Sequence, residues 1–377
     1  MSQAESLPVL KTSVHDLKYL SAVLRGVNFA TRATITVTKT GLVVVVEESR
    51  TLLGTAYVFA DVFDEFTYHP EVTEGQSSQQ PTIQEEETDY CSAFEISLNT
   101  FMECMNIYGT ASGSSSKSGK LKPFKNYGDE SNGPESDDDQ AEGAQDRGDK
   151  RSKPGGGRSE HFFGGSERGT GMRLTYIGPG FPLTVTLAQD ASGPTTTCEI
   201  PTFDAEPHLE LPFDSEKMVL KIILKSSWLR DALSELDSSC DKLAFIGNPP
   251  EIPEAGAQTA RQRQRARMQA KPNFRIEAAG SFGNTEARFI RRMDYPNDRD
   301  VLESFECVNP VSFSYRFSHI ARTMRALQTS VKTSLRIDDE GLLSLQFLMP
   351  SSTSRLNSGG GTSNFIEFRC LALEDDT

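Results

Sequence analysis

Ser312-Phe313-Ser314-Tyr315-Arg316-Phe317 begins the stretch, residues 312–347, from which the fold of the whole chain is predicted. Its polar and aromatic side chains alternate, a pattern typical of a half-buried strand. Ser318 then stands where a helix N-cap is expected. Phe317, Ile320, Met324 and Leu327 follow at spacings of three, four and three residues, which predict an amphipathic helix directly after the strand.

The rest of this stretch predicts a β-hairpin. Residues 331–337 and 342–347 alternate between apolar and polar, and residues 338–341 between them read Asp-Asp-Glu-Gly. Two alternating runs around such a segment are typical of antiparallel strands joined by a tight turn. From residue 311 to residue 337 there is no acidic residue, and the basic residues are Arg316, Arg322, Arg325, Lys332 and Arg336. In an acidic chain this run indicates a locally basic surface.

The same strand–helix–strand unit occurs four times. The first three copies begin with strands expected at 9–14, 93–97 and 219–225, and their later strands are expected at 33–38, 42–46, 172–176, 183–187 and 242–246. Their helices repeat the apolar spacing with Leu17, Leu20, Leu24 and Val27, with Leu98, Phe101, Met105 and Tyr108, and with Leu229, Leu233 and Leu236. Because a repeated unit determines an architecture, we expect an α+β fold of antiparallel sheets in two similar halves.

The repeats also divide the chain into domains. Its 377 residues fit two domains, at 1–201 and 218–377, joined by a proline-containing, acidic linker at 202–217. Residues 109–170 are rich in Ser, Gly and acids and predict a disordered insert in the first domain. Residues 248–271 predict a loop in the second. Its basic cluster is interpreted as a nuclear-import signal, a nucleic-acid contact or a solvated loop, and consists of Arg261, Arg263, Arg265 and Arg267.

Composition excludes several classes of protein. A net charge of −14 excludes a basic protein that coats nucleic acid, although it permits a local basic surface. No apolar run approaches the roughly eighteen residues of a membrane span, so no membrane association is expected. Residues 1–7 lack the pattern of a secretion signal. Six scattered cysteines without a CxxC pair fit reduced thiols in the cytosol or nucleus and argue against structural zinc.

No active site is predicted. The five histidines have no metal-ligand spacing, and the sequence lacks a phosphate-binding loop, a nucleophile elbow and a dinucleotide fingerprint. Most acids cluster in expected loops and turns, where solvated side chains are the simpler interpretation. His319 is expected to be structural, and Trp228 is expected to pack against neighbours. We therefore predict no catalytic residue, no metal and no cofactor.

Basic residues on the repeated helices suggest a different kind of site. Lys18 and Arg25 lie opposite the leucines of the first helix, and Arg322 and Arg325 take a similar place on the fourth. The third helix offers Arg230, whereas the second offers no basic residue. Basic side chains on one helix face attract phosphates without reading bases. The alternative for any single helix is an ordinary solvated face.

The chain resembles the DNA sliding clamps, and among them the Rad-one subunit of the nine-one-one (Rad9–Rad1–Hus1 type) DNA-damage checkpoint clamp. The resemblance is carried by residues 222–237 (IILKSSWLRDALSELD), 274–284 (FRIEAAGSFGN), 294–296 (DYP), 335–347 (LRIDDEGLLSLQF) and 365–368 (FIEF). It implies the sliding-clamp (PCNA-like) fold, with two similar domains whose helices line a ring around duplex DNA. It also implies a nuclear protein.

The resemblance further implies partners and a role. The chain would form a heterotrimeric ring with two other clamp-like subunits, placed on double-stranded DNA, independent of sequence, by an ATP-dependent checkpoint clamp loader. It would serve there as a platform for checkpoint kinase signalling and DNA repair, with client peptides docking beneath the linker. Ring closure would pair the edges 195–200 and 282–290, whose interface residues are Thr195, Thr197, Glu199, Phe282, Asn284, Glu286 and Arg288. Two alternatives stay open: a 3′–5′ exonuclease in DNA damage processing, and a homotrimeric replication processivity clamp.

Overall fold

The structure is a computed structural model. It describes residues 7–70, 91–109, 169–189, 193–236, 239–249, 273–280, 302–351 and 363–374, and the backbone alone of 283–289. Most of the predicted insert at 109–170 and of the predicted loop at 248–271, including its four arginines, lies outside the described residues.

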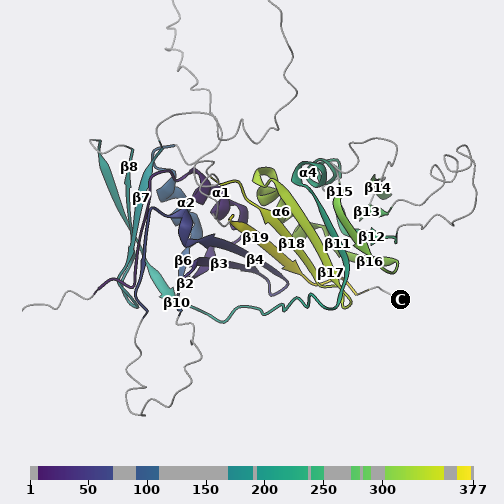
Figure 1. The fold of residues 1–377 in the computed structure, drawn as a ribbon, viewed down its shortest axis with the longest axis horizontal. Helices are drawn as coiled ribbons and strands as arrows, with labels where there is room; N and C mark the ends of the chain where they lie inside the picture. Colours follow the sequence, from purple (N-terminus) through teal and green to yellow (C-terminus); the bar gives the residue numbers. More distant parts are fainter. Residues whose placement is uncertain are drawn as a thin grey trace, which may run out of the picture. The chain divides into compact units, whose positions relative to one another are not determined.

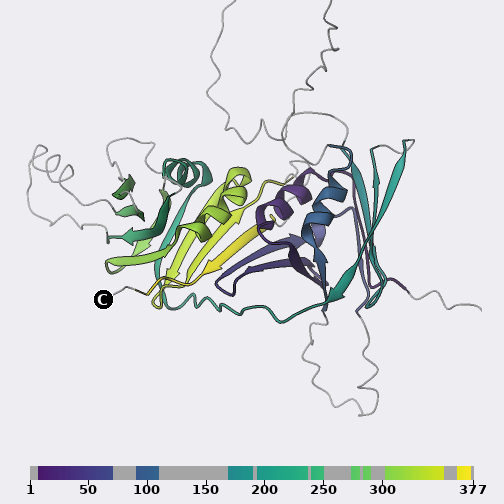
Figure 2. The same ribbon diagram turned by 180° about the vertical axis from the view of Figure 1, so that it is seen from behind.

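Four α-helices lie side by side on one face of a ten-stranded sheet (Figures 1 and 2). They are α1 (Lys18–Val27), α2 (Leu98–Met105), α4 (Ser226–Ser234) and α6 (Phe317–Thr329). Contacts between neighbours place them in the order α2, α1, α6, α4. All four are helices that the apolar spacing predicts.

The ten-stranded sheet runs through both halves of the chain in the order β10-β6-β2-β3-β4-β19-β18-β17-β11-β15. Its strands are β10 (Thr202–Asp204), β6 (Ser92–Ser97), β2 (Arg32–Thr38), β3 (Gly41–Glu48), β4 (Leu52–Phe59), β19 (Phe365–Cys370), β18 (Leu343–Leu348), β17 (Lys332–Asp338), β11 (Met218–Lys225) and β15 (Leu302–Cys307). The two halves meet where β4 pairs with β19, with Tyr57 opposite Phe365 and Leu52 opposite Cys370.

Two smaller sheets complete the described fold. The five-stranded sheet, in the order β5-β1-β7-β8-β9, consists of β5 (Glu65–Tyr68), β1 (Leu10–Val14), β7 (Gly171–Tyr176), β8 (Leu183–Ala188) and β9 (Thr195–Ile200). The four-stranded sheet, in the order β14-β13-β12-β16, consists of β14 (Gly283–Phe289), β13 (Phe274–Gly280), β12 (Cys240–Gly247) and β16 (Val311–Arg316). A short 3-10 helix, η1 (Ala60–Val62), precedes β5. Every strand pair among the described residues is antiparallel, so the predicted α+β class with antiparallel sheets is confirmed.

The strand orders repeat. The order β5-β1-β7-β8-β9 of the first half recurs in the second as β15-β11-β17-β18-β19, and β6-β2-β3-β4 recurs as β16-β12-β13-β14. In this comparison β14 is the counterpart of β4, and β9 is the counterpart of β19. Inside the chain β4 and β19 are paired with each other, whereas β14 and β9 stand at the ends of their sheets.

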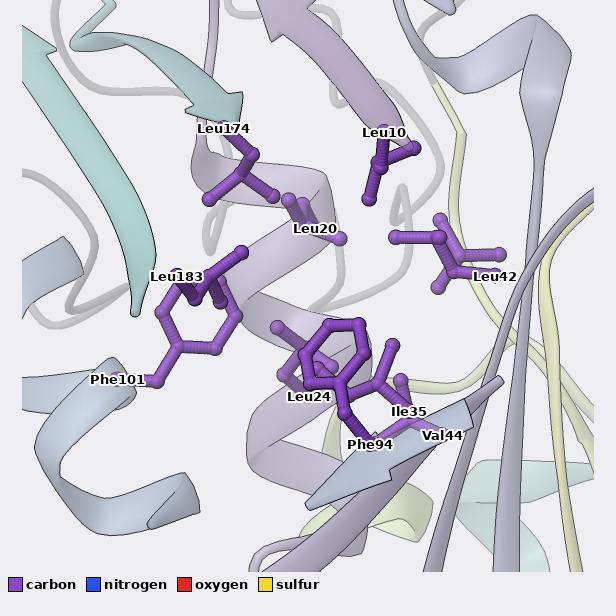
Figure 3. A pocket seen from close by; sticks show the side chains of 11 residues that line it. Leu10, Leu20, Leu24, Ile35, Leu42, Val44, Phe94, Phe101, Leu174 and Leu183 are labelled. Atoms are coloured by element: carbon purple, nitrogen blue, oxygen red, sulfur yellow. The ribbon is translucent and has the colours of Figure 1, made fainter. Parts of the chain in front are cut away.

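The core of the first half lies between its two sheets and the helices α1 and α2. Figure 3 shows a small cavity there, lined by the side chains of Leu10, Leu20, Leu24, Ile35, Leu42, Val44, Val58, Phe94, Phe101, Leu174 and Leu183. These residues come from two sheets and two helices, and all are apolar. Burial of such side chains is the main favourable contribution to folding. The spaced leucines of α1 are therefore core residues, as predicted.

The helices α1 and α6 touch at a contact that we call the seam. It is centred on Gly26 and Ala326, and Ala326 is fully buried. A Cβ atom on Gly26 would lie 3.3 Å from the Ala326 Cβ and 2.4 Å from the Ile366 Cδ1. Glycine at this position lets the two helices approach closely. The seam covers the sheet above the β4–β19 pair.

Several local predictions differ from the structure. Ser318 is not the N-cap of α6: β16 runs directly into the helix, which begins at Phe317 and leaves Arg316 in the N-cap position. The segment 202–217, predicted as a linker, begins with β10, which pairs with β6. The sequence patterns did not predict β4, β5, β13, β15 or β19 as strands. Trp228, expected to pack, is 46% exposed, so that prediction is wrong.

Replacing Gly26 with valine tests the seam. The added side chain would overlap Ile366, and the helices must separate to admit it. We expect Gly26→Val to lower the free energy of unfolding by about 1–3 kcal/mol, measured by urea denaturation. Ile366→Val removes the Cδ1 atom that lies nearest, so the double variant should lose less stability than the sum of the two single variants. Additive losses would contradict this account of the seam.

Candidate nucleic-acid interface and sheet edges

The five basic residues predicted to face DNA lie on three of the four helices. Lys18 and Arg25 are half-buried on α1, Arg322 and Arg325 are exposed on α6, and Arg230 is half-buried on α4. Because α1 packs on α6 at the seam, four of the five lie on neighbouring helices. Arg230 lies apart from them, on the far side of α6.

Arg25 and Arg325 interact with each other across the seam. Burial, and then the charge of Arg325, lower the pKa of the Arg25 guanidinium. Arg25 Nη2 donates a hydrogen bond to Ser21 Oγ at 3.3 Å, and Arg325 Nη1 donates to the backbone carbonyl of Asn28. Two like charges held close raise each other's free energy, and a phosphate between them would lower it. The seam is therefore the best candidate for a phosphate contact.

Arg322 and Lys18 extend this basic surface with less free charge. Arg322 forms an ion pair with Glu48 of β3, with 3.0 Å between Nε and Oε2 and 3.1 Å between Nη2 and Oε1. Part of its charge is thus used to hold α6 on the β3–β4 turn. The backbone N–H of Lys18 donates to Asp16 Oδ1 at 3.0 Å, which satisfies an amide at the start of α1.

The other two helices contribute little positive charge. Arg230 Nη2 lies 2.9 Å from Asp231 Oδ1 on the same helix, so this pair presents almost no net charge. On α2 the exposed residues are Asn99, Thr100 and Glu103, and Asn106 follows at its C-cap. The basic surface is therefore concentrated at the seam and is not spread evenly over the four helices.

The opposite face of the ten-stranded sheet carries the linker. Figures 1 and 2 show residues 205–217 running along the side of the sheet away from the helices. Leu211 is buried with Val45, Leu53 and Leu342, and Leu209 and Phe213 pack against this cluster.

Three polar contacts fix the linker in this position. The backbone N–H of Leu209 donates to Glu47 Oε2 at 2.7 Å, and Arg369 Nη1 donates to the carbonyl of Leu211 at 2.7 Å. The guanidinium of Arg336 lies 4.8 Å from the centre of the Phe213 ring. Arg336 belongs to the acid-free run 311–337 but lies on this face, so the basic residues of that run do not share one surface.

The strands β9 and β14, predicted as ring-closing edges, stand at the ends of their sheets. On β9, Thr195, Thr197 and Glu199 are exposed. On β14, the backbone of Asn284, Glu286 and Arg288 lies within the strand, and Phe282 lies outside the described residues.

The end of α2 is fixed to β9. The Tyr108 hydroxyl donates to the backbone carbonyl of Pro194 at 2.9 Å and lies 2.9 Å from Thr196 Oγ1. Burial and the neighbouring Cys198 thiol of β9 raise the pKa of the Cys104 thiol to about 11. The end of α2 and the edge strand β9 therefore form one continuous surface at this end of the five-stranded sheet.

Among the described residues, no three His, Cys, Asp or Glu side chains are grouped so as to hold a metal ion. The cavity in Figure 3 has only apolar walls, which offer neither a nucleophile nor a proton acceptor. Within the described part of the chain, no helix has the length and apolar character needed to span a membrane.

Comparison with known proteins identifies relatives over almost the whole chain. A family model described as "Repair protein Rad1/Rec1/Rad17" matches residues 9–349. The mouse cell cycle checkpoint protein RAD1 is 28% identical over 366 residues, which cover 97% of this chain and 93% of the relative. The DNA repair exonuclease REC1 of Mycosarcoma maydis is 25% identical over 460 residues, covering 99% of this chain and 98% of the relative.

Among solved structures, the proliferating cellular nuclear antigen of Entamoeba histolytica is similar to this chain. The TM-score is 0.57 at 10% sequence identity, and the match covers 98% of this chain and all of the other. This similarity confirms the predicted sliding-clamp fold.

His319, near the start of α6, gives the contact of this helix with the β3–β4 turn a dependence on pH. It is 8% exposed, Nε2 lies 3.4 Å from Thr51 Oγ1, and burial followed by the charge of Arg316 lowers its pKa. The folded protein thus binds this proton less readily than the unfolded chain, whose histidine pKa is about 6.5. The stability contribution of neutral His319 is present above that pH and is lost as the pH falls through the folded pKa. In urea denaturation, His319→Gln should flatten this decline, whereas His208→Gln in the exposed linker should not.

Proposed function

The chain belongs to the Rad1/Rec1/Rad17 family of repair proteins, and from that premise we propose that it is a non-catalytic subunit of a heterotrimeric checkpoint clamp. The clamp encircles DNA at sites of damage and serves as a platform for checkpoint kinase signalling and DNA repair. Relatives named as checkpoint proteins support the checkpoint role. The sliding-clamp fold supports the ring.

The repeated strand order is the observation that carries the proposal. Within the chain, the first half joins the second through the antiparallel pair β4–β19. The counterparts of these two strands, β14 and β9, end their sheets with one edge unpaired in the described chain. An unpaired edge is a template for another strand, so β14 of one subunit and β9 of the next would repeat the internal junction. Such head-to-tail contacts close into a ring when the rotation allows.

DNA would be held mainly by encirclement. The seam arginines Arg25, Arg322 and Arg325, together with Lys18, would face the duplex and contact phosphates weakly and without regard to sequence. Arg230, paired with Asp231, would contribute less. Weak phosphate contacts let a closed ring slide, so tight binding is not needed.

The role implies specific partners and a location. Two other clamp-like subunits would provide the edges that meet β9 and β14. An ATP-dependent checkpoint clamp loader would open the ring and place it on double-stranded DNA in the nucleus. The proposal requires neither a cofactor nor a membrane.

An exonuclease is the second candidate, because one relative of similar length is named a DNA repair exonuclease. Removal of nucleotides by a metal-dependent mechanism needs carboxylates that converge on Mg²⁺. The described residues do not group three such ligands. Metal-dependent degradation that one Asp or Glu substitution abolished would establish this candidate instead.

Native mass spectrometry tests the proposed assembly. We expect the chain alone to be monomeric, and the chain co-expressed with Rad9-type and Hus1-type subunits to form a complex with one copy of each. A trimer of this chain alone would favour a homotrimeric replication clamp. A monomer that binds neither subunit would refute the ring.

Neutralising the seam tests the DNA-facing surface. In the assembled ring, the combined substitutions Arg25→Gln, Arg322→Gln and Arg325→Gln should reduce the slope of log affinity for duplex DNA against log salt by about 2–3, since each lost phosphate contact removes about 0.9. The matched control, Lys221→Gln, Lys225→Gln and Lys332→Gln, removes three charges from the opposite face of the sheet. Equal slopes for the two triple variants would show that the seam does not face DNA.

A further inference from the structure

The four helices can be compared position by position because their apolar residues share one spacing. Gly26, Ile107, Glu235 and Ala326 each stand one position before the last residue of their helix's series, which is Val27, Tyr108, Leu236 or Leu327. The strand repeat further pairs the helices by type: α4 is the counterpart of α1, and α2 is the counterpart of α6.

Inside the chain this shared position is the point of contact between the halves. Gly26 of α1 meets Ala326 of α6, and both are buried. The neighbouring seam residues Ala22 of α1 and Thr323 of α6 are buried as well. A helix of the α1 type thus packs on a helix of the α6 type through this face.

The same face is exposed on the other two helices. At the end of α2, Ile107 is 51% exposed, and Thr100 on the same face is exposed too. On α4, Trp228 is 46% exposed, and Asp231 and Glu235 beside it are also exposed. Ile107, in the turn that follows α2, and Trp228, on α4, are thus large apolar side chains that are open to solvent.

Each exposed face is continuous with a sheet edge proposed to close the ring. Tyr108 fixes the end of α2 to β9. In the strand repeat, α4 and β14 of the second half correspond to α1 and β4 of the first half, and α1 contacts β4. Inside the chain, the junction between the halves thus consists of a strand pair, β4–β19, and a helix pair, α1–α6. At the two ends of the chain's sheets, β9 with α2 and β14 with α4 each provide one strand and one helix of such a junction.

We propose that the face Thr100, Cys104 and Ile107 of α2 and the face Trp228, Asp231 and Glu235 of α4 are the helix contacts of the two subunit junctions in the ring. The first face receives the α4-type helix of one neighbour, and the second receives the α2-type helix of the other. The inference rests on the proposed function, since it needs a ring.

The chemistry of the two faces specifies their partners. The α4 face carries the Glu235 carboxylate and an indole ring, with Asp231 already paired with Arg230, so it fits a helix with a basic residue and an apolar residue. The α2 face is uncharged and includes the apolar side chain of Ile107, so it fits a helix with an uncharged residue at the Gly26 position. Burying an unpaired carboxylate against an apolar side chain is unfavourable.

This requirement disfavours a ring made of three copies of this chain. In such a ring Ile107 would take the place of Ala326 and Glu235 would take the place of Gly26, so the carboxylate of Glu235 would be buried against Ile107. Two different neighbours avoid this contact if each carries a matching residue. The helix faces thus favour a heterotrimer over a homotrimer.

Site-specific photocrosslinking in the assembled complex tests the proposal directly. The full chain is co-expressed with Rad9-type and Hus1-type subunits, and benzoylphenylalanine replaces Ile107 or Trp228. We expect a crosslink from position 107 to one subunit and from position 228 to the other. Crosslinks from both positions to the same subunit, or from neither position in a ring that has formed, would overturn the proposal.

Substitutions provide an independent measurement. Ile107→Asp and Trp228→Ala should each raise the dissociation constant of the complex at least about tenfold, measured by native mass spectrometry across a dilution series. Leu371→Asp is the control, because Leu371 is 50% exposed and lies outside the helices. Thermal unfolding of each isolated variant confirms that it folds.

The outcomes separate the two proposals. If the wild-type chain forms no ring with either subunit, the proposed function fails. If the wild-type ring forms and both helix variants assemble as tightly as the Leu371 control, the ring stands and the helix-face inference fails.

Discussion

The pairing of β4 with β19 is the interaction on which the rest of the structure depends. It joins two sets of strands with the same internal order into one ten-stranded sheet. Because backbone hydrogen bonds carry this junction, its geometry is largely independent of side chains. Side chains then decide what may meet across it, and Gly26 against Ala326 lets the helices above the pair approach closely. The same backbone geometry with different side chains suits a junction between different subunits.

The two faces of the ten-stranded sheet differ in what packs on them and in how their arginines are used: the helices lie on one face and the linker lies on the other. The helix face carries Arg25 and Arg325, which repel each other across the seam. On the linker face, Arg336 and Arg369 both bind the buried Glu367, at 2.9 and 2.8 Å. An arginine used in this way stabilises the linker and is not available to a phosphate. The two arginines of the helix face can therefore contact a phosphate, whereas the two arginines of the linker face hold the linker.

The sequence was informative where burial follows a regular period. The spacing of three, four and three placed all four helices, and alternation placed β16, β17 and β18. It did not reveal β4, where Leu52, Leu53, Thr55 and Ala56 are all buried and Gly54 interrupts the run, so no alternation appears. Nor could it reveal β5, whose four residues are too few to show a period. The domain boundaries, the DNA-facing residues and the ring-closing edges stay predictions.

The candidate site was only partly predictable for a related reason. A basic residue on a helix is visible in the sequence, but its neighbours are not, and these decide what its charge can do. Arg230 and Arg325 look alike in the sequence; one is neutralised by Asp231, and the other lies across the seam from Arg25. Trp228 shows the same limit, since the sequence does not reveal that this large apolar side chain is 46% exposed. The internal repeat supplies the missing comparison. The strand edge and helix face that one half buries against the other inside the chain correspond to an edge and a face that, in the proposed ring, a neighbouring subunit buries.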